Sequence, residues 1–252
     1  MAASQWEPMA AGDSGLHRMD PRAKMIIATA FSLVVAMGRG WSMLGLALGL
    51  GLLVIILARV PWGPVFKRLA VVNFFIAFLW LTLPFTLVTG GDGWRFTLDP
   101  RGVEMALVIT LKANAIVLVV MGMVSTTPVV RLLHALHHMK VNDKLVHLFM
   151  FFFRYIHVFN QEYQRMRRAM RVRAFAPKSN LHTYRAMANL VGMLLVRSYD
   201  RAERVYQAML CRGFTGTYWV LDHFHWHRRD TWLSYLAALG LAVMVWAAVA
   251  MP

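Results

Sequence analysis

Long apolar runs, separated by short polar or basic breaks, fill the first half of the chain and its last twenty residues. They cover 25–37, 41–58, about 69–88, about 103–124 and 231–250. Because about 20 apolar residues make a helix long enough to cross a bilayer, the pattern predicts about five transmembrane helices. The first run has about 13 helical residues and reaches only about 20 Å, so it needs flanking residues or a tilt. The stretch TGGDGWRFTLDPRG, between the third and fourth runs, predicts a turn-rich loop.

Residues 125–230 contain no apolar run that satisfies a span and show the period of amphipathic helices instead. Thr127-Pro128 predicts a helix start, because proline is favoured in the first turn. Asn142 or Asp143 can cap the next helix, which carries LVHLFMFFFRYIHVF. Histidine and arginine interrupt this run and basic residues flank it, so we expect the helix to lie in or against the membrane surface.

A second long amphipathic helix is predicted from about His182 to Arg212, after a break at Pro177. One of its faces is apolar with helical spacing. Another face carries, at steps of three or four residues, Arg197, Arg201, Arg204, Ala208 and Arg212. The pattern predicts two long helices with a continuous apolar face on the second.

Within-helix ion pairs are expected for Glu162, Asp200 and Glu203, for example between Glu162 and Arg165 and between Asp200 and Arg204. Glu162 lies three residues before Arg165, and Asp200 lies four before Arg204. Charges at these spacings are neighbours on a helix surface.

Composition and charge fix the class and the orientation. Of the 252 residues, 58% are hydrophobic, which is typical of an integral membrane protein. The net charge is +15, and 17 of the 27 Lys and Arg residues lie in 125–230, against six acidic residues. Positive residues near span ends face the cytoplasm, so this segment and the N-terminus are expected inside and the C-terminus outside. We expect an acidic protein partner, not nucleic acid.

One short phrase occurs twice in the basic segment, as RAMRVRAF and QAMLCRGF. The shared positions are Ala169, Met170, Arg173, Ala174 and Phe175 in the first copy and Ala208, Met209, Arg212, Gly213 and Phe214 in the second. Alanine and arginine four apart share a helix face, so a shallow recess lies beside a guanidinium that can bind carboxylates. Glycine suits the residue past a helix end, and phenylalanine adds an apolar anchor. The phrases predict two similar docking ends; the alternative is a chance match of solvated arginines.

The chain resembles the transmembrane T component of energy-coupling-factor (ECF) transporters, in the cobalt and nickel branch called CbiQ or NikQ. The resemblance covers nearly the whole length and is carried by MDPRAK, STTPVVRLLHAL, FFRYIHVFNQEYQRMRRAMRVRAF and LVRSYDRAERVYQAMLCRGF. It implies one all-α domain over 1–252, with a cytoplasmic N-terminus (1–24), four spans (25–124), crossed coupling helices (125–230) and a last span (231–250).

The resemblance implies that each phrase docks into one of two ATP-binding-cassette ATPase subunits. Ala169 and Arg173 then belong to the first signature, and Ala208, Arg212 and Gly213 to the second. Ala174 departs from the family pattern, which has glycine there, so the first helix is expected to end differently or to run on to Pro177. Residues that support the coupling helices would be Glu162, Arg201, Arg204, Phe175 and Phe214.

The resemblance also implies a subunit that couples ATP hydrolysis by its partners to a separate substrate-binding membrane subunit (CbiM- or NikM-like), with a small accessory membrane subunit as a further partner. The cargo would be cobalt, or nickel, taken up through a prokaryotic inner membrane. The sequence holds no GxxxxGK[ST] loop, which agrees with a non-catalytic subunit without a cofactor. A T component for vitamin uptake is the nearest alternative.

Two histidine clusters keep a di-iron hydroxylase or desaturase open as an alternative. HALHH (134–138) has the spacing of one histidine box, but HFHWH (223–227) does not, and such enzymes need several boxes. A basic membrane-surface scaffold is a third alternative. Cys211 is the only cysteine and is expected to be a small apolar filler. Lys112, inside the fourth span, is expected to face a polar partner such as Asn73 or Asn114.

Overall fold

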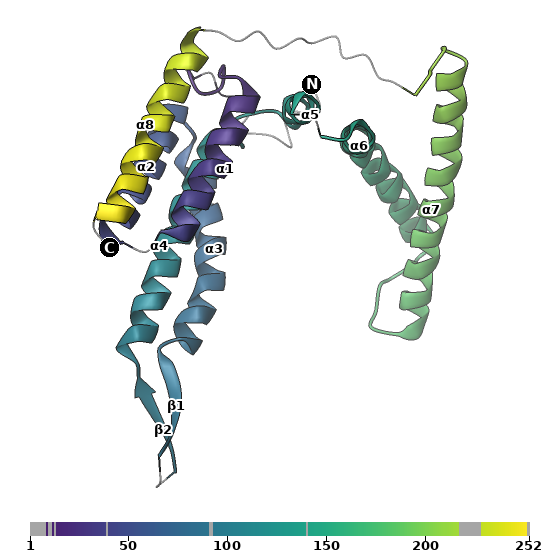
Figure 1. The fold of residues 1–252 in the computed structure, drawn as a ribbon. Helices are drawn as coiled ribbons and strands as arrows, with labels where there is room; N and C mark the ends of the chain where they lie inside the picture. Colours follow the sequence, from purple (N-terminus) through teal and green to yellow (C-terminus); the bar gives the residue numbers. More distant parts are fainter. Residues whose placement is uncertain are drawn as a thin grey trace. The chain divides into compact units, whose positions relative to one another are not determined.

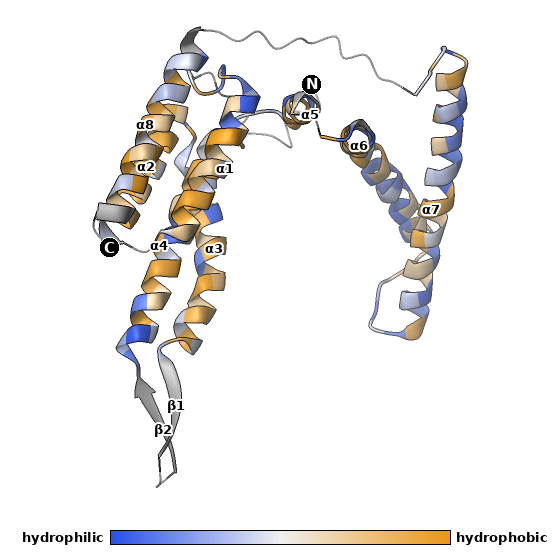
Figure 2. Ribbon diagram, viewed as in Figure 1, coloured by the Kyte–Doolittle hydropathy of each residue, from blue (hydrophilic) through white to orange (hydrophobic). Residues whose placement is uncertain are grey.

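The computed structural model describes residues 9, 12, 14–38, 40–90, 93–139, 141–216 and 228–250. The chain divides into two compact units. We call residues 1–135 with 224–252 the membrane unit, and residues 136–223 the basic unit. Figure 2 shows why these names fit: apolar residues dominate the helices of the first unit, and hydrophilic residues are frequent on α6 and α7 of the second.

The membrane unit is built from five helices and one hairpin among the described residues. Its elements are α1 (Pro21–Met37), α2 (Trp41–Ala58), α3 (Trp62–Thr82), β1 (Phe85–Gly90), β2 (Gly93–Leu98), α4 (Pro100–Met123) and α8 (Arg228–Ala250), as drawn in Figure 1. Within the described residues, α2, α3, α4 and α8 are long and apolar enough to cross a membrane. The prediction of an all-α, multi-pass membrane protein is confirmed.

Helix α1 is not among these four helices. Its 17 residues make a helix about 26 Å long, somewhat short of a hydrocarbon core of about 30 Å. The crossing of the bilayer by residues 25–37, as a fifth span, therefore stays a prediction. The short α5 (Val129–His138) follows α4 and begins after Pro128, as the sequence predicts.

The third span differs from its predicted position. A helix was expected over about 69–88, but α3 begins at Trp62 and ends at Thr82. Lys67 and Arg68 lie inside its first two turns. Leu83 still has helical angles, but Pro84 ends the helix because proline has no N–H to continue its hydrogen bonds.

The expected loop between the third and fourth spans is a β-hairpin. Strands β1 and β2 pair antiparallel, with Phe85 opposite Leu98 and Gly90 opposite Gly93. The alternation of apolar and polar residues in FTLVTG and GWRFTL, around a glycine-rich centre, carries that signal. This hairpin is the only strand pair in the described part of an otherwise helical chain.

Close contact between α2 and α4 forms the core of the membrane unit. Gly51 and Gly122 allow it: a Cβ at Gly122 would lie 2.5 Å from Cγ1 of Val54, and one at Gly51 would lie 3.1 Å from Leu118. Small residues at helix interfaces let backbones approach closely in membrane proteins. Large apolar side chains of α3, such as Phe74 and Phe75, are instead exposed, as lipid-facing residues are.

Lys112 has a different partner from those predicted. Its Nζ donates to the carbonyl oxygen of Ala36, 2.8 Å away, in the last turn of α1. Asn73 and Asn114, the expected partners, bond to each other through both amides, at 3.1 and 3.0 Å. A cation at a helix C-terminus is favourable because unpaired carbonyls and the helix dipole are negative there.

Candidate functional site

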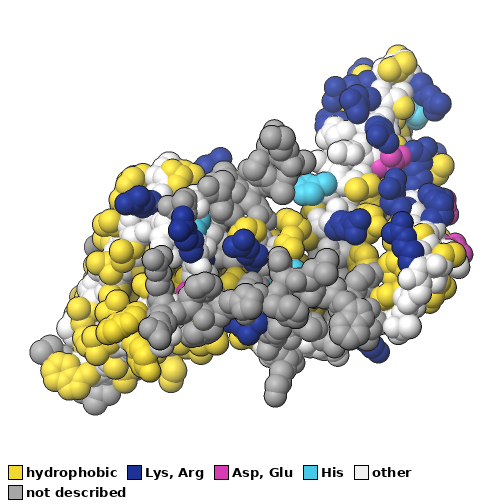
Figure 3. Space-filling model, turned by 90° about the horizontal axis from the view of Figure 1, so that it is seen from above, with side chains coloured by type: hydrophobic (Ala, Val, Ile, Leu, Met, Phe, Trp, Pro, Cys, Tyr) yellow, Lys and Arg dark blue, Asp and Glu magenta, His cyan; other side chains and the backbone are white. Residues whose placement is uncertain are grey.

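The basic unit is dominated by two 30-residue helices, α6 (Asp143–Val172) and α7 (Leu181–Leu210), each about 45 Å long. Asn142 caps α6 by accepting from the N–H of Lys144 at 3.0 Å. Asn180 caps α7 in the same way, accepting from the N–H of Thr183 at 3.0 Å. The predicted start of α6 and both predicted ends of α7 are confirmed to within about two residues, the usual uncertainty of a helix boundary. Helix α6 ends at Val172, earlier than the predicted end just before Pro177. Figure 3 shows Lys and Arg side chains gathered over this unit.

The two helices are tied together by Glu162. Its carboxylate accepts from the guanidinium of Arg197 on α7 and lies 3.6 Å from Arg165 on its own helix. The Glu162 side chain is only 16% exposed, whereas that of Arg197 is 50% exposed. The predicted pair with Arg165 is confirmed, and the stronger contact with Arg197 is one that sequence reasoning missed.

The predicted pair of Asp200 and Arg204 does not form. Both residues are described and exposed, and no ion pair joins them. Both line a polar recess of about 210 Å³ with Glu162 and Arg197, so they lie around the same crossing.

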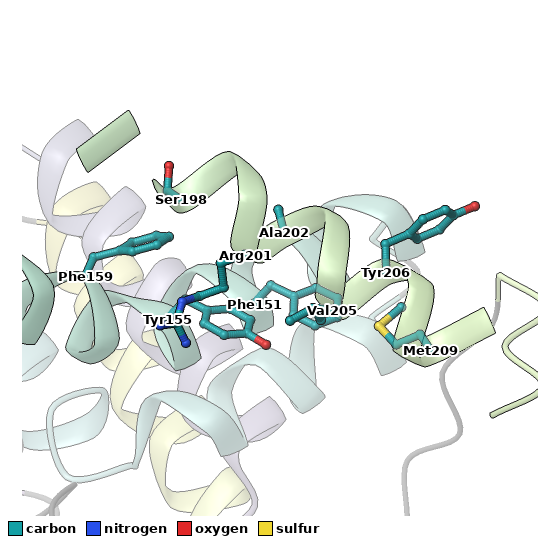
Figure 4. Close-up of a pocket in the computed structure, with 9 residues that line it drawn as sticks. All are labelled: Phe151, Tyr155, Phe159, Ser198, Arg201, Ala202, Val205, Tyr206 and Met209. Atoms are coloured by element: carbon teal, nitrogen blue, oxygen red, sulfur yellow. The ribbon is translucent and has the colours of Figure 1, made fainter. Parts of the chain in front are cut away.

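An apolar groove lies beside this crossing, with a volume of about 230 Å³ (Figure 4). Its α6 wall is a ladder of aromatic rings one turn apart, Phe151, Tyr155 and Phe159, with centroids 6.2 and 6.4 Å apart. Its α7 wall consists of Ser198, Arg201, Ala202, Val205, Tyr206 and Met209. The N-terminal half of α6 therefore faces the C-terminal half of α7, and the helices run antiparallel past each other. Figure 4 shows Arg201 reaching from α7 toward Tyr155.

The two repeated phrases have the same backbone structure. In the first, the N–H of Phe175 donates to Met170 O at 3.1 Å and that of Ala174 to Arg171 O at 3.0 Å. In the second, the N–H of Phe214 donates to Met209 O at 3.1 Å and that of Gly213 to Leu210 O at 3.0 Å. This pair of bonds is the Schellman motif, which ends a helix with one left-handed residue.

Ala174 takes that left-handed place although it is not glycine. Its φ is +58°, and the φ of Gly213 is +78°. The expectation that α6 ends differently because glycine is missing is therefore wrong. Alanine accepts the conformation at a cost of about 1–2 kcal/mol, the Cβ penalty of the left-handed region.

Side-chain exposure repeats between the phrases as well. Ala169, Arg173 and Ala174 are exposed and so are Ala208, Arg212 and Gly213, whereas the methionine and phenylalanine of each phrase are half-buried. Each helix thus ends in an arginine that directly precedes the left-handed residue and projects beside a small alanine. We call these two surfaces the signature ends.

The signature ends lie at opposite ends of the crossed pair. Arg173 is 11 residues beyond Glu162 on α6, and Arg212 is 15 beyond Arg197 on α7, or about 17 and 23 Å along the helix axes. Because the helices run antiparallel, these distances extend in opposite directions, and the ends are up to about 40 Å apart. In Figure 1 the turn that joins α6 to α7 lies at one end of α7, and the C-terminus of α7 lies at the other end. The two signature ends are therefore separate surfaces.

The different residues at the left-handed position give a matched test. Replacing Ala174 by Gly should stabilise the end of α6 by about 1 kcal/mol, because the Cβ strain disappears, and Gly213→Ala should destabilise the end of α7 by a similar amount. Hydrogen exchange of the amides of Phe175 and Phe214 measures both local stabilities. If Ala174→Gly speeds exchange at Phe175, Ala174 does not carry this strain.

The histidine clusters cannot be assembled into a metal site from the described side chains. Among these, no group of three or more possible metal ligands occurs. His134 lies on α5, but the side chains of His137 and His138, and all of 223–227, lie outside the described residues.

Comparison with known proteins decides the family. A family model described as cobalt transport protein, CbiQ, matches residues 12–219. The chain belongs to the CbiQ family. The match spans both signature ends, and it confirms the family that the repeated phrases and MDPRAK predict.

Curated relatives of this CbiQ-family chain include three whose names describe transport. It is 25% identical over 232 residues to the ECF transporter transmembrane protein EcfT of Brevibacillus brevis, covering 86% of this chain and 85% of the relative. It is 34% identical over 121 residues to nickel permease LarQ of Lactiplantibacillus plantarum (48% and 42%). It is 27% identical over 133 residues to cobalt transport protein CbiQ of Rhodobacter capsulatus (53% of each). The matched stretches span about half the length of several relatives.

Proposed function

We propose that this CbiQ-family chain is the energy-coupling T subunit of an ATP-driven uptake transporter. Its two signature ends hold two ATP-binding-cassette subunits, and the crossed helices α6 and α7 carry the movement of these subunits toward the membrane. The observation that supports this role most directly is the equivalence of the two ends. They share the Schellman bonds, the exposure pattern and the position of the arginine, and they lie up to about 40 Å apart.

The geometry suits a rigid lever. An apolar aromatic groove and the ion pair of Glu162 with Arg197 join two long helices near their middle. Packed helices of this kind move as rigid bodies, so that a displacement of one signature end changes the crossing as a whole. Arg201 and Arg204 line the crossing and support it, and Phe175 and Phe214 anchor the helix ends.

The proposed cargo is a divalent transition metal, cobalt or nickel. The names of the family and of two relatives refer to cobalt and nickel, and we carry that substrate class over to this chain. We place substrate recognition on a separate CbiM- or NikM-like membrane subunit. Hydrolysis of ATP belongs to the cassette subunits, so this chain is not itself an enzyme.

We place the chain in a prokaryotic inner membrane, with residues 125–230 and the N-terminus in the cytoplasm and the C-terminus outside. The concentration of Lys and Arg in 125–230 supports this orientation.

The experiment that tests the function is affinity purification of the chain from membranes that co-express its cassette subunits and substrate-binding subunit, followed by uptake of radioactive cobalt and nickel into vesicles. We expect the cassette subunits to be retained and metal uptake to require ATP. A purified chain that retains no cassette subunit and instead contains iron would overturn the proposal in favour of the di-iron enzyme.

A further inference from the structure

A lysine is fully buried where three helix ends of the membrane unit meet. Lys24, in the first turn of α1, has none of its side chain exposed. Its Nζ donates to Thr127 Oγ1 at 2.6 Å and, at a longer 3.4 Å, to Thr126 Oγ1. Next to it, the backbone N–H of Asp20 donates to Oδ1 of Asp230, 3.3 Å away. All five residues of this cluster are buried to at least nine-tenths.

The cluster is electrostatically consistent with its location. Asp20 caps the N-terminus of α1, accepting from Arg22 N at 2.9 Å, and Asp230 lies in the first turn of α8. Carboxylates are favourable at helix N-termini, and a cation is favourable at a C-terminus. Lys24 accordingly faces the C-terminal end of α4, where Thr126 donates to Gly122 O at 3.0 Å. The start of α1, the start of α8 and the end of α4 are thereby joined by side chains.

Stability alone does not account for a buried lysine here. Lys24 precedes the apolar stretch 25–37 and so lies outside the membrane-spanning segments. Burial and, to a lesser extent, the nearby Arg131 lower the pKa of its ammonium, Asp230 raises it, and the resulting pKa is about 8. Removing an ammonium from water is costly, and apolar residues of similar volume often give equal or greater stability. The buried charge of Lys24 therefore indicates that its role is to hold its partner residues in place.

Two residues of the cluster, Thr127 and Asp230, lie near the points where the chain leaves the membrane unit and returns to it. Thr127 directly precedes Pro128 and α5, through which the chain passes into the basic unit. Asp230 lies in the first turn of α8, the helix by which the chain returns to the membrane unit. Both connections are thus attached, within the membrane unit, to the first turn of α1.

We propose that the cluster of Asp20, Lys24, Thr126, Thr127 and Asp230 is the joint that transmits movement of the basic unit to the membrane helices. This inference rests on the proposed function, because it assigns the residues that carry the proposed coupling. Lys24 and Thr127 are its positioning residues: they touch neither metal nor ATP and act by holding both chain connections to α1. The proposal also assigns a role in coupling to two residues of MDPRAK, Asp20 and Lys24.

The test compares wild type with Lys24→Met in the complete transporter, reconstituted in liposomes. The measured quantity is metal taken up per ATP hydrolysed. We expect Lys24→Met to lower this ratio about tenfold, with cassette subunits still bound and ATP still hydrolysed. Lys112→Met is the matched control, since it also removes a lysine that bonds α1, but at the other end of the helix and away from the chain connections. It should leave the ratio within about twofold of wild type.

If the Lys24→Met transporter does not assemble, Thr127→Val provides the test. It removes only the hydroxyl that accepts the 2.6 Å hydrogen bond from Lys24 and keeps the shape of the side chain. A lowered ratio in Thr127→Val supports the joint. An unchanged ratio in an assembled Lys24→Met or Thr127→Val complex overturns it and leaves the cluster a static clamp. Failure of the proposed function gives a different result, since wild type itself would then show no ATP-driven uptake.

Discussion

Reversing the charge at both signature ends, by Arg173→Glu and Arg212→Glu together, should release the cassette subunits while the chain stays inserted in the membrane. Both arginines are exposed and make no ion pair within the described part of the chain, so their replacement costs little folding stability. A guanidinium buried against a partner carboxylate contributes about 2–5 kcal/mol. Its reversal should therefore weaken each contact by about 30-fold or more.

Affinity purification with quantified cassette subunits measures this release. Each single reversal should leave one of the two signature ends occupied, and the double variant should leave neither. Arg167→Glu and Arg185→Glu are the matched controls, because they reverse exposed arginines of α6 and α7 outside the signature ends. If the double variant loses under about 1 kcal/mol of binding, the arginines lie at a solvated rim and docking uses another surface.

Local sequence patterns predicted most of the basic unit. In the second phrase, the i, i+4 spacing of alanine and arginine, followed by glycine and phenylalanine, predicts the end of α7 to within about two residues. Asn142 and Asn180 act as caps because their side chains reach the first free N–H groups, which depends only on neighbours in the sequence. Two local predictions are wrong. At Ala174, residue preference is a weaker constraint than the bonds of a Schellman motif. Asp200 and Arg204, both described, have the right spacing but form no ion pair.

Partners distant in the sequence could not be predicted in this way. The sequence predicts an asparagine partner for Lys112, but its ammonium bonds to a carbonyl at the end of α1. The burial of Lys24 cannot be predicted from its neighbours in the sequence, because it depends on where α4 and α8 lie. Helical periodicity shows which face of a helix is buried, but not which residue of another helix it meets.

Apolar composition also did not separate strand from helix at the end of the third span. Phe85 to Val88 continue the apolar run of α3, yet they form β1 because Pro84 ends the helix and a paired strand follows on the far side of the glycines. The prediction extended the helix by hydropathy alone, and hydropathy carries no information about hydrogen-bond partners.

Reversing the charge of Glu162 at the helix crossing, by Glu162→Lys, should change the angle between α6 and α7. The substitution replaces an attraction by repulsion from Arg165 and Arg197, in a side chain that is mostly buried. Because Arg197 is half exposed, solvent screens the pair, and we expect a loss of about 1–2 kcal/mol. The displacement of the signature ends should be large despite this small loss of free energy. Each end lies about 20 Å from the crossing along its helix, so a small rotation at the crossing moves it by several ångströms.

Spin labels at the two signature ends measure that rotation directly. Cys211, the only cysteine, is exposed beside Arg212 and serves as one attachment point. Val172→Cys, at a position 88% exposed on α6, supplies the other. In an otherwise wild-type chain the distance should be narrowly distributed and at most about 40 Å, and Glu162→Lys should broaden or shift it by about 5 Å or more.

The charge swap distinguishes a lost ion pair from general damage to the helices. Glu162→Lys with Arg197→Glu restores opposite charges across the crossing, so the narrow distance should return. The double variant keeps a repulsion between the new lysine and Arg165, so the recovery should be incomplete. If the swap stays as broad as Glu162→Lys alone, the apolar groove and not the ion pair fixes the crossing. The aromatic ladder of Phe151, Tyr155 and Phe159 would then be the element that sets the lever angle.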